Sequence, residues 1–199
     1  GQAGAGQGGA GPGGRDPRVV FLETLMGLLN RIERFPKPVI AAVNGFALAG
    51  GTEIIQGTDI RLASTNARFG LSEPKRGIVP AGGSMVRLVR QIPFSKAMEI
   101  LLTGDDLSAE EAHRIGLVNK VTSPARLHDE AVAMARRIAD NAPLAVRAIK
   151  EVVLRTSGIP LEDAYAIEDA GAAVVMRSSD AREGPRAFLE RRKPRFQGS

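Results

Sequence analysis

The periodicity of this 199-residue sequence changes near residue 124. Before that point, short apolar segments typical of buried strands alternate with helical patterns, whereas everything after Pro124 has helical periodicity. Strands that alternate with helices favour a mostly parallel sheet connected by crossover helices. The sequence therefore predicts an α/β core followed by a helical C-terminal region.

Four segments of the first part have the character of extended chain. The clearest is PVIAAV, residues 38–43, which is wholly apolar and is predicted to form a strand buried on both faces. Asn44 and Gly45 then turn the chain. The predicted extended segments are 38–43, 59–63, 67–69 and 117–121.

Prolines and capping residues indicate where the helices begin and end. Asp16 and Pro17 suit the first positions of a helix that continues to Arg34, and FPKP at 35–38 ends it because proline lacks an N–H and disfavours helix in the residue before it. SAEE at 108–111 has the form of a capping box. The helices predicted after residue 124 span 124–140, 143–156, 160–177 and 180–192.

Composition narrows the classes of function. The chain has no cysteine, which excludes disulfides and thiolate chemistry, and its two histidines, His113 and His128, disfavour a multi-histidine metal site. No apolar run reaches about 18 residues, so no membrane partner is expected and the predicted location is the cytoplasm. The net charge of +5 is concentrated near the C-terminus, but no aromatic-rich sheet motif accompanies it, so a phosphorylated ligand is favoured over nucleic acid.

Residues 38–53, PVIAAVNGFALAGGTE, combine a buried strand, a glycine pair and the start of a helix. The first N–H groups of a helix lack an internal acceptor, and glycine allows a ligand oxygen to approach them, so Gly50 suits a developing oxyanion. Glu53 follows within the first helical turn, beside the same cavity. Taken alone, the segment favours the simpler interpretation, in which Gly50-Gly51 is only a tight turn and Glu53 a carboxylate that favours the helix dipole.

A second carboxylate, Glu73, lies in ARFGLSEPKRGIVPAGG, residues 67–83. Glycine and proline crowd this segment, so it is predicted to be a loop. A single carboxylate in a loop is usually solvated, and the segment alone assigns no role to Glu73.

These two segments, together with TGDDLSAEEAHRIGLVNKV and SSDAREGPRAFLERRKPRF, resemble the enoyl-CoA hydratase/isomerase (crotonase) superfamily in order and spacing. The resemblance covers about residues 37–196. It implies a crotonase-like spiral of ββα units, incomplete at the N-terminus, followed by a helical trimerisation region. The expected organisation is a glycine-rich disordered lead at 1–15, an α/β core at 16–134 and a helical oligomerisation region at 135–199.

The resemblance also implies roles for individual residues. Gly50 falls on one of two oxyanion amides, Glu53 on the carboxylate that activates water, and Glu73 on the carboxylate that delivers a proton. No motif for the second oxyanion amide is found upstream of residue 16. The remaining positions implied to bind substrate are Ala49, Gly51, Pro80, Gly82, Phe188 and Lys193, of which the last two approach the CoA of a neighbouring subunit.

The resemblance therefore implies a 2-enoyl-CoA hydratase that needs neither metal nor cofactor, because CoA is part of the substrate. It acts on fatty-acid-type acyl-CoA thioesters and assembles as a homotrimer or a dimer of trimers. Two readings remain beside it. One is another crotonase-type reaction, such as isomerisation or decarboxylation; the other is a non-catalytic acyl-CoA-binding subunit.

Overall fold

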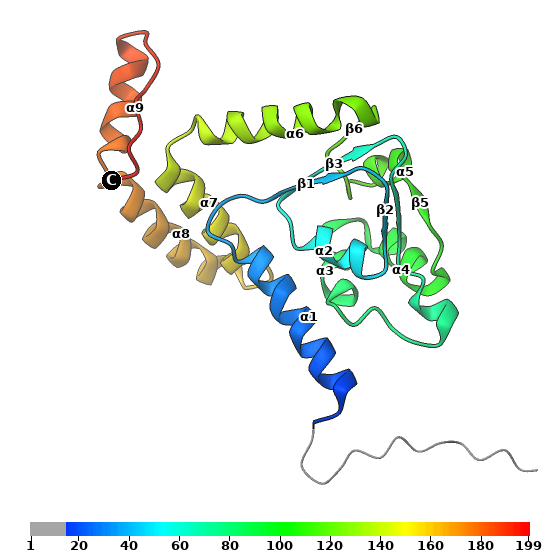
Figure 1. Ribbon diagram of the computed structural model, residues 1–199. Coiled ribbons are helices and arrows are strands. Elements are labelled where there is room, and N and C mark those ends of the chain that lie inside the picture. Colours follow the sequence, from blue (N-terminus) through cyan, green and yellow to red (C-terminus); the bar gives the residue numbers. More distant parts are fainter. Residues whose placement is uncertain (1–14) are drawn as a thin grey trace, which may run out of the picture.

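The computed structural model describes residues 15–199, so the predicted glycine-rich lead lies almost wholly outside the described residues. Two small sheets and several helices form the core, and a group of helices follows it along the chain (Figure 1). No helix within 15–199 is long and apolar enough to cross a membrane.

The first sheet is parallel and follows the alternation of the sequence. It consists of β1 (Ile40–Val43), β3 (Ile60–Ser64) and β6 (Lys120–Thr122), in the order β1-β3-β6. Ile40 lies opposite Ile60, and Leu62 opposite Lys120. This arrangement confirms the predicted parallel pairing of the apolar segments.

A second sheet was not predicted as a separate unit. It consists of β2 (Phe46–Leu48), β4 (Arg68–Gly70) and β5 (Leu107–Ser108), with β2 parallel and β5 antiparallel to β4. The expectation of one mostly parallel sheet is therefore wrong in this respect. The chain leaves β1, turns at Asn44 and Gly45, and enters the second sheet directly at β2.

Short helices connect and cover these strands, and a longer one precedes them. Ser108 accepts a hydrogen bond from the N–H of Glu111 at 3.1 Å, which confirms the predicted helix cap. The elements are α1 (Pro17–Glu33), α2 (Gly50–Gln56), η1 (Glu73–Arg76, a 3₁₀ helix), α3 (Ser84–Gln91), α4 (Phe94–Thr103) and α5 (Ala109–Arg114).

Four helices end the chain, close to the predicted ranges. In Figure 1, α6 runs across the β1-β3-β6 sheet, α7 and α8 pack together as a hairpin, and α9 lies beyond them. Prolines open the first two of these helices. They are α6 (Pro124–Ala139), α7 (Pro143–Thr156), α8 (Leu161–Met176) and α9 (Asp180–Leu189).

The buried core joins the second sheet to the helices around it. Phe69 of β4 and Leu88 of α3 are fully buried, together with Ala97 of α4. Aliphatic residues and alanine supply nearly all of this core, as the scarcity of aromatic residues predicted, and Phe69 is its aromatic member. Burial at about 25 cal/mol per Å² of apolar surface makes this cluster the main stabiliser of the frame that carries α2 and η1.

Three expectations about the elements need correction. β1 is not buried on both faces, since Ala42 is exposed while Val43 is buried. The strand predicted at 117–121 is β6 at Lys120–Thr122, because Leu117 and Val118 bury their side chains in the loop before it. The last helix ends at Leu189, and Arg191 adopts a positive φ of 51° shortly afterwards.

Candidate active site

The start of α2 is tied to the neighbouring strand β4. The N–H of Ala49 donates to the Gly70 carbonyl at 2.8 Å, and the N–H of Gly70 donates to Thr52 Oγ at 3.1 Å. Ala49 itself has φ 49° and ψ −120°, a conformation that L residues rarely adopt. These bonds fix the first turn of α2 and therefore the direction of the side chain at position 53.

Glu53 points into the protein and is 3% exposed. Its Oε1 accepts a hydrogen bond from the N–H of Gly82 at 2.6 Å. A Cβ built at Gly82 would lie 2.2 Å from Glu53 Oε2, so the carboxylate occupies the space that a side chain would need. Glycine at position 82 is therefore required by the close approach of the carboxylate.

Glu73 is the first residue of η1 rather than part of an irregular loop. The 3₁₀ turn ends at Gly77, whose φ of 70° suits glycine. Glu73 is 8% exposed, so the solvated state typical of loop carboxylates does not apply. Its Oε2 is buried and has no hydrogen-bond partner among the described residues, which leaves an acceptor or proton-carrying site free.

The two carboxylates influence each other electrostatically. Burial raises the pKa of Glu53 above its ordinary value, and the charge of Glu73 raises it further. The hydrogen bond from Gly82 and the positive charge of Arg87 oppose this rise. α2 and η1 thus bring Glu53 and Glu73 together, as the sequence interpretation required.

Gly50 and Gly51 form the first turn of α2, next to this pair. As the first residue of the helix, Gly50 has an N–H without an acceptor inside the helix. A Cβ built at Gly50 would meet nothing within 4 Å, whereas one at Gly51 would lie 3.7 Å from Ala47 Cβ. The side of Gly50 is therefore open to a ligand.

An apolar groove of about 650 Å³ includes Ala81, the residue before Gly82, in its lining. It lies between the first turns of α1 and the segment between η1 and Gly82, and none of the residues within 15–199 that line it is charged. Pro80, on that segment, is buried. The residues that line the groove are Pro17, Phe21, Leu22, Gly77, Ile78, Val79 and Ala81.

Phe188 and Lys193 are not brought to this place within the chain. Phe188 is on α9 and is 82% exposed, and Lys193 lies on the exposed segment after it. Figure 1 shows α9 well separated from α2. Of the predicted set, the structure therefore groups the residues between 49 and 82 and leaves these two apart.

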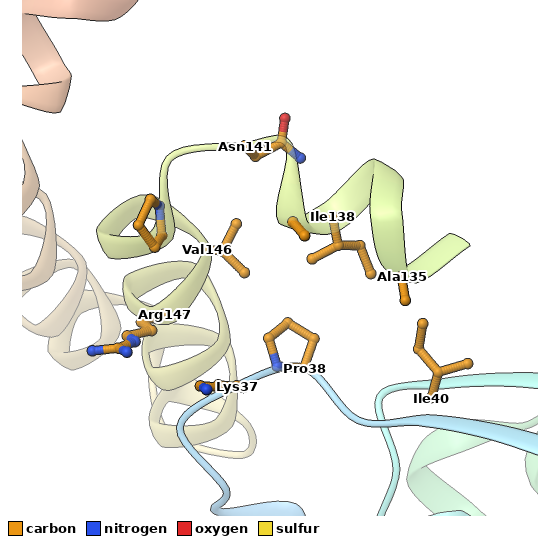
Figure 2. A pocket seen from close by; sticks show the side chains of 10 residues that line it. Lys37, Pro38, Ile40, Ala135, Ile138, Asn141, Val146 and Arg147 are labelled. Atoms are coloured by element: carbon orange, nitrogen blue, oxygen red, sulfur yellow. The ribbon is translucent and has the colours of Figure 1, made fainter. Parts of the chain in front are cut away.

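A different cavity, of about 430 Å³, lies between the segment that enters β1 and the helices α6 and α7 (Figure 2). Its lining includes Pro38, Ile40, Ile138 and Val146, and its charged members are Lys37 and Arg147. None of the described residues that line it is a carboxylate, so it lacks the acid and base groups gathered at α2 and η1.

Sequence reasoning missed the residues that support Gly82 from behind. Arg87 donates from Nη1 to the Gly82 carbonyl at 3.1 Å, and from Nη2 to Asn30 Oδ1 and Glu33 Oε2, both at 2.9 Å. Asn30 and Glu33 precede Arg87 by more than fifty residues, and no local pattern links such distant positions. We refer to Asn30, Glu33 and Arg87 together as the rear clamp.

The chain belongs to the enoyl-CoA hydratase/isomerase family. The family model described as "Enoyl-CoA hydratase/isomerase" matches residues 2–199. The buried pair Glu53 and Glu73 thus stands in the sequence context of that family, and the resemblance seen in the sequence is confirmed.

Individual relatives define the match more closely. The chain is 49% identical over 164 residues to the enoyl-CoA hydratase EchA19 of Mycobacterium tuberculosis, a match that covers 82% of this chain and 62% of that protein. It is 43% identical over 174 residues to the carnitinyl-CoA dehydratase of Escherichia coli, covering 85% of this chain and 67% of the relative. The chain thus spans just under two thirds of the length of the mycobacterial protein.

The fold is shared with solved structures. The crystal structure of an enoyl-CoA hydratase from Bacillus anthracis superimposes with a TM-score of 0.90 at 36% identity, covering 94% of this chain and 73% of the other. This likeness confirms the predicted crotonase-like α/β fold with its helical C-terminal region.

Proposed function

We propose that this protein is an enoyl-CoA hydratase, which adds water across the 2,3 double bond of a 2-enoyl-CoA thioester. The observation that carries the proposal is the pair of buried carboxylates, Glu53 from α2 and Glu73 from η1, close enough for one charge to raise the pKa of the other. Relatives with the printed names enoyl-CoA hydratase and carnitinyl-CoA dehydratase support the same class of reaction.

The roles follow from the chemistry of hydration. Water attacks the β-carbon, and enolate charge develops on the thioester oxygen, where the N–H of Gly50 would stabilise it. Glu53, held by Gly82, would orient the water and take its proton as a general base. Glu73, with one buried oxygen free of partners, would supply the proton to the α-carbon.

Two carboxylates favour hydration over isomerisation. An isomerase returns the proton that it removes, so one carboxylate suffices, whereas hydration needs one group for water and one for the α-carbon. Both Glu53 and Glu73 are buried, and they lie close enough for the charge of Glu73 to raise the pKa of Glu53. A second buried acid would have no function in a reaction that moves one proton out and back.

The surroundings of the pair suit an acyl chain. The apolar groove lined by Ala81, next to Gly82, would receive the hydrocarbon tail. Ala49 and Gly51 would shape the thioester pocket at the start of α2, and Pro80 and Gly82 its opposite wall. CoA is part of the substrate in this proposal, and no separate cofactor is invoked.

The experiment follows the loss of the conjugated-thioester absorbance of 2-butenoyl-CoA with wild type, Glu53→Gln and Glu73→Gln. Each substitution keeps the shape of the side chain and removes its acid–base function. We expect kcat to fall by about a hundredfold or more in each variant. Glu110→Gln, on the exposed first turn of α5, is the matched control and is expected to keep the wild-type rate.

Equal rates in wild type and both variants would contradict the assignment of the carboxylates. Stabilisation by CoA thioesters without turnover would instead favour a non-catalytic acyl-CoA-binding subunit. Turnover of other CoA thioesters without hydration would favour isomerisation or decarboxylation.

We also propose that the helical C-terminal region assembles the protein into a homotrimer or a dimer of trimers. Apolar side chains of the α7–α8 hairpin are exposed in the single chain, among them Ile149, Val153 and Met176. Phe188 and Lys193 would then reach the CoA of a neighbouring subunit. Light scattering at working concentration is expected to give three or six times the mass of one chain; a monomer would contradict the proposal.

A further inference from the structure

The two glycines Gly82 and Gly83 lie between side chains of opposite charge. On one side the N–H of Gly82 donates to Glu53 at 2.6 Å, and on the other Arg87 donates to the Gly82 carbonyl at 3.1 Å. A Cβ built at Gly83 would lie 2.2 Å from Arg87 Nη1, just as one built at Gly82 would lie 2.2 Å from the Glu53 carboxylate. The glycine backbone is therefore in direct contact with the carboxylate on one side and with the guanidinium on the other.

The guanidinium of Arg87 is itself held in place by the other two members of the rear clamp, Asn30 and Glu33. Arg87 Nε and Nη2 donate to the two carboxylate oxygens of Glu33 at 3.2 and 2.9 Å, and Nη2 also donates to Asn30 Oδ1. The side chain of Arg87 is 11% exposed. A two-point contact of this kind fixes the plane of the guanidinium, which a single hydrogen bond does not do.

We propose that Arg87 is a positioning residue for Glu53, acting through the backbone of Gly82 and held in place by Asn30 and Glu33 of α1. The path is continuous, since each step from α1 to Arg87, to Gly82 and to Glu53 is a hydrogen bond within the described residues. A loss of the clamp would free Gly82 to move and would withdraw the donor that orients the general base. This inference rests on the proposed hydratase function.

Arg87 also acts on the charge of Glu53. The groups that face Glu53 are Glu73 from η1, whose charge raises its pKa, and Arg87 from α3, whose charge lowers it. Arg87 is faced in turn by Glu33 from α1, while Arg34 and Arg90 line the same cavity. Removal of the Arg87 charge is therefore expected to raise the pKa of Glu53.

The alternative is that the Arg87–Glu33 pair only fastens α1 to α3. A fastening role would change stability when it is lost, but it would leave the chemical step of the remaining folded enzyme unchanged. The two roles are therefore separated by kcat of the folded variants.

The test compares Arg87→Met with Arg90→Met. Arg90 is on the same helix and carries the same charge, but it is exposed and donates to the Val86 carbonyl of its own helix. Two quantities are measured in the expressed protein: kcat and KM with 2-butenoyl-CoA, and the pH titration of the Glu53 carboxyl by ¹³C NMR, assigned with Glu53→Gln.

For Arg87→Met we expect kcat to fall about tenfold or more, with KM changed by less than about threefold, because the base is misplaced while the binding groove is intact. The Glu53 titration is expected to move to higher pH, and the rising limb of kcat/KM against pH moves with it, since the base must be ionised. Glu73→Gln is expected to move the Glu53 titration the opposite way. Arg90→Met is expected to change none of these quantities.

An unchanged Glu53 titration in Arg87→Met, or an equal shift in Arg90→Met, would overturn the inference. If Arg87→Met does not fold, Arg87→Lys decides: it keeps the charge but cannot bond Gly82, Asn30 and Glu33 together, so a reduced kcat is expected and a wild-type kcat would overturn the proposal. Absence of hydration by the wild type would contradict the proposed function, and the NMR titration would still show whether the Arg87 charge acts on Glu53.

Discussion

The carboxylates near α2 and those of α9 are the same chemical groups in opposite settings. Glu53 is buried beside another acid, and its pKa is raised by burial and by Glu73. Glu183 on α9 accepts from Arg192 at 2.6 and 2.9 Å and from the N–H of Arg195 at 2.8 Å, and these bonds lower its pKa to about 2. At α2 the burial of the Glu53 carboxylate is only partly offset by its surroundings. On α9 the Glu183 carboxylate is stabilised by hydrogen bonds from Arg192 and Arg195.

The difference shows how the fold separates reactive from structural acids. A carboxylate with several donors is stable as an anion and makes a poor proton acceptor at neutral pH. Glu53 has Gly82 as its backbone donor, and Glu73 Oε2 has no partner among residues 15–199. A buried acid with a raised pKa, such as Glu53, is typical of a functional site, whereas Glu183 fastens the C-terminal segment to α9.

The largest effect is expected from a substitution at Gly82. The methyl group of Gly82→Ala would lie on the Glu53 carboxylate, so the base must move or the loop must shift. We expect kcat for 2-butenoyl-CoA to fall by about a hundredfold or more, because small displacements of a catalytic group have effects of this size. Steady-state kinetics beside a thermal melt would measure the effect on the folded protein.

Gly27→Ala is the control for this substitution. Gly27 is exposed on α1, and a Cβ there meets nothing within 4 Å. The change is expected to leave kcat unaltered and to stabilise the protein by about 0.5–1 kcal/mol through helix propensity. Wild-type kcat in Gly82→Ala would show that Glu53 does not depend on this close approach.

A smaller effect is expected at the other site. Because the pKa of Glu183 is about 2 in the folded protein against an ordinary 4.5, its ionised form stabilises the fold above pH 4.5, and this contribution is lost as the pH falls toward 2. Glu183→Gln should therefore lower Tm slightly at neutral pH, since partly exposed ion pairs contribute little. The difference from wild type should shrink in melts recorded at successively lower pH. A difference independent of pH would show that the charge of Glu183 does not stabilise the fold.

Local sequence patterns predicted the frame of the molecule well. Proline and capping signals located α1, α6 and α7 to within a residue or two, because these signals act through the backbone nearby. β2 was missed because Phe46–Leu48 is too short to show a period. α4, at Phe94–Thr103, was missed although Gly104 caps its C-terminus, because no side chain caps its N-terminus. Contacts between residues far apart in the sequence could not be predicted, because no local sequence pattern accompanies them.

The candidate site, like the fold, could be predicted only in part from the sequence. Glu53 and Glu73 were found through family resemblance, and their burial and mutual influence became visible with the fold. The bond between Gly82 and Glu53 joins residues 29 apart, and that between Arg87 and Glu33 joins residues 54 apart. Such pairs depend on how α1, α2 and α3 pack, which periodicity does not specify.

The backbone of Ala49 has a consequence for the balance between stability and activity. Its positive φ of 49° stores strain of about 1–3 kcal/mol, which the hydrogen bonds to Gly70 and from Glu53 must overcome. The turn that presents Gly50 is therefore strained rather than relaxed. Selection for thermal stability alone would favour a sequence without this strain. The strain is retained only if the geometry that it enforces contributes more to activity than it costs in stability.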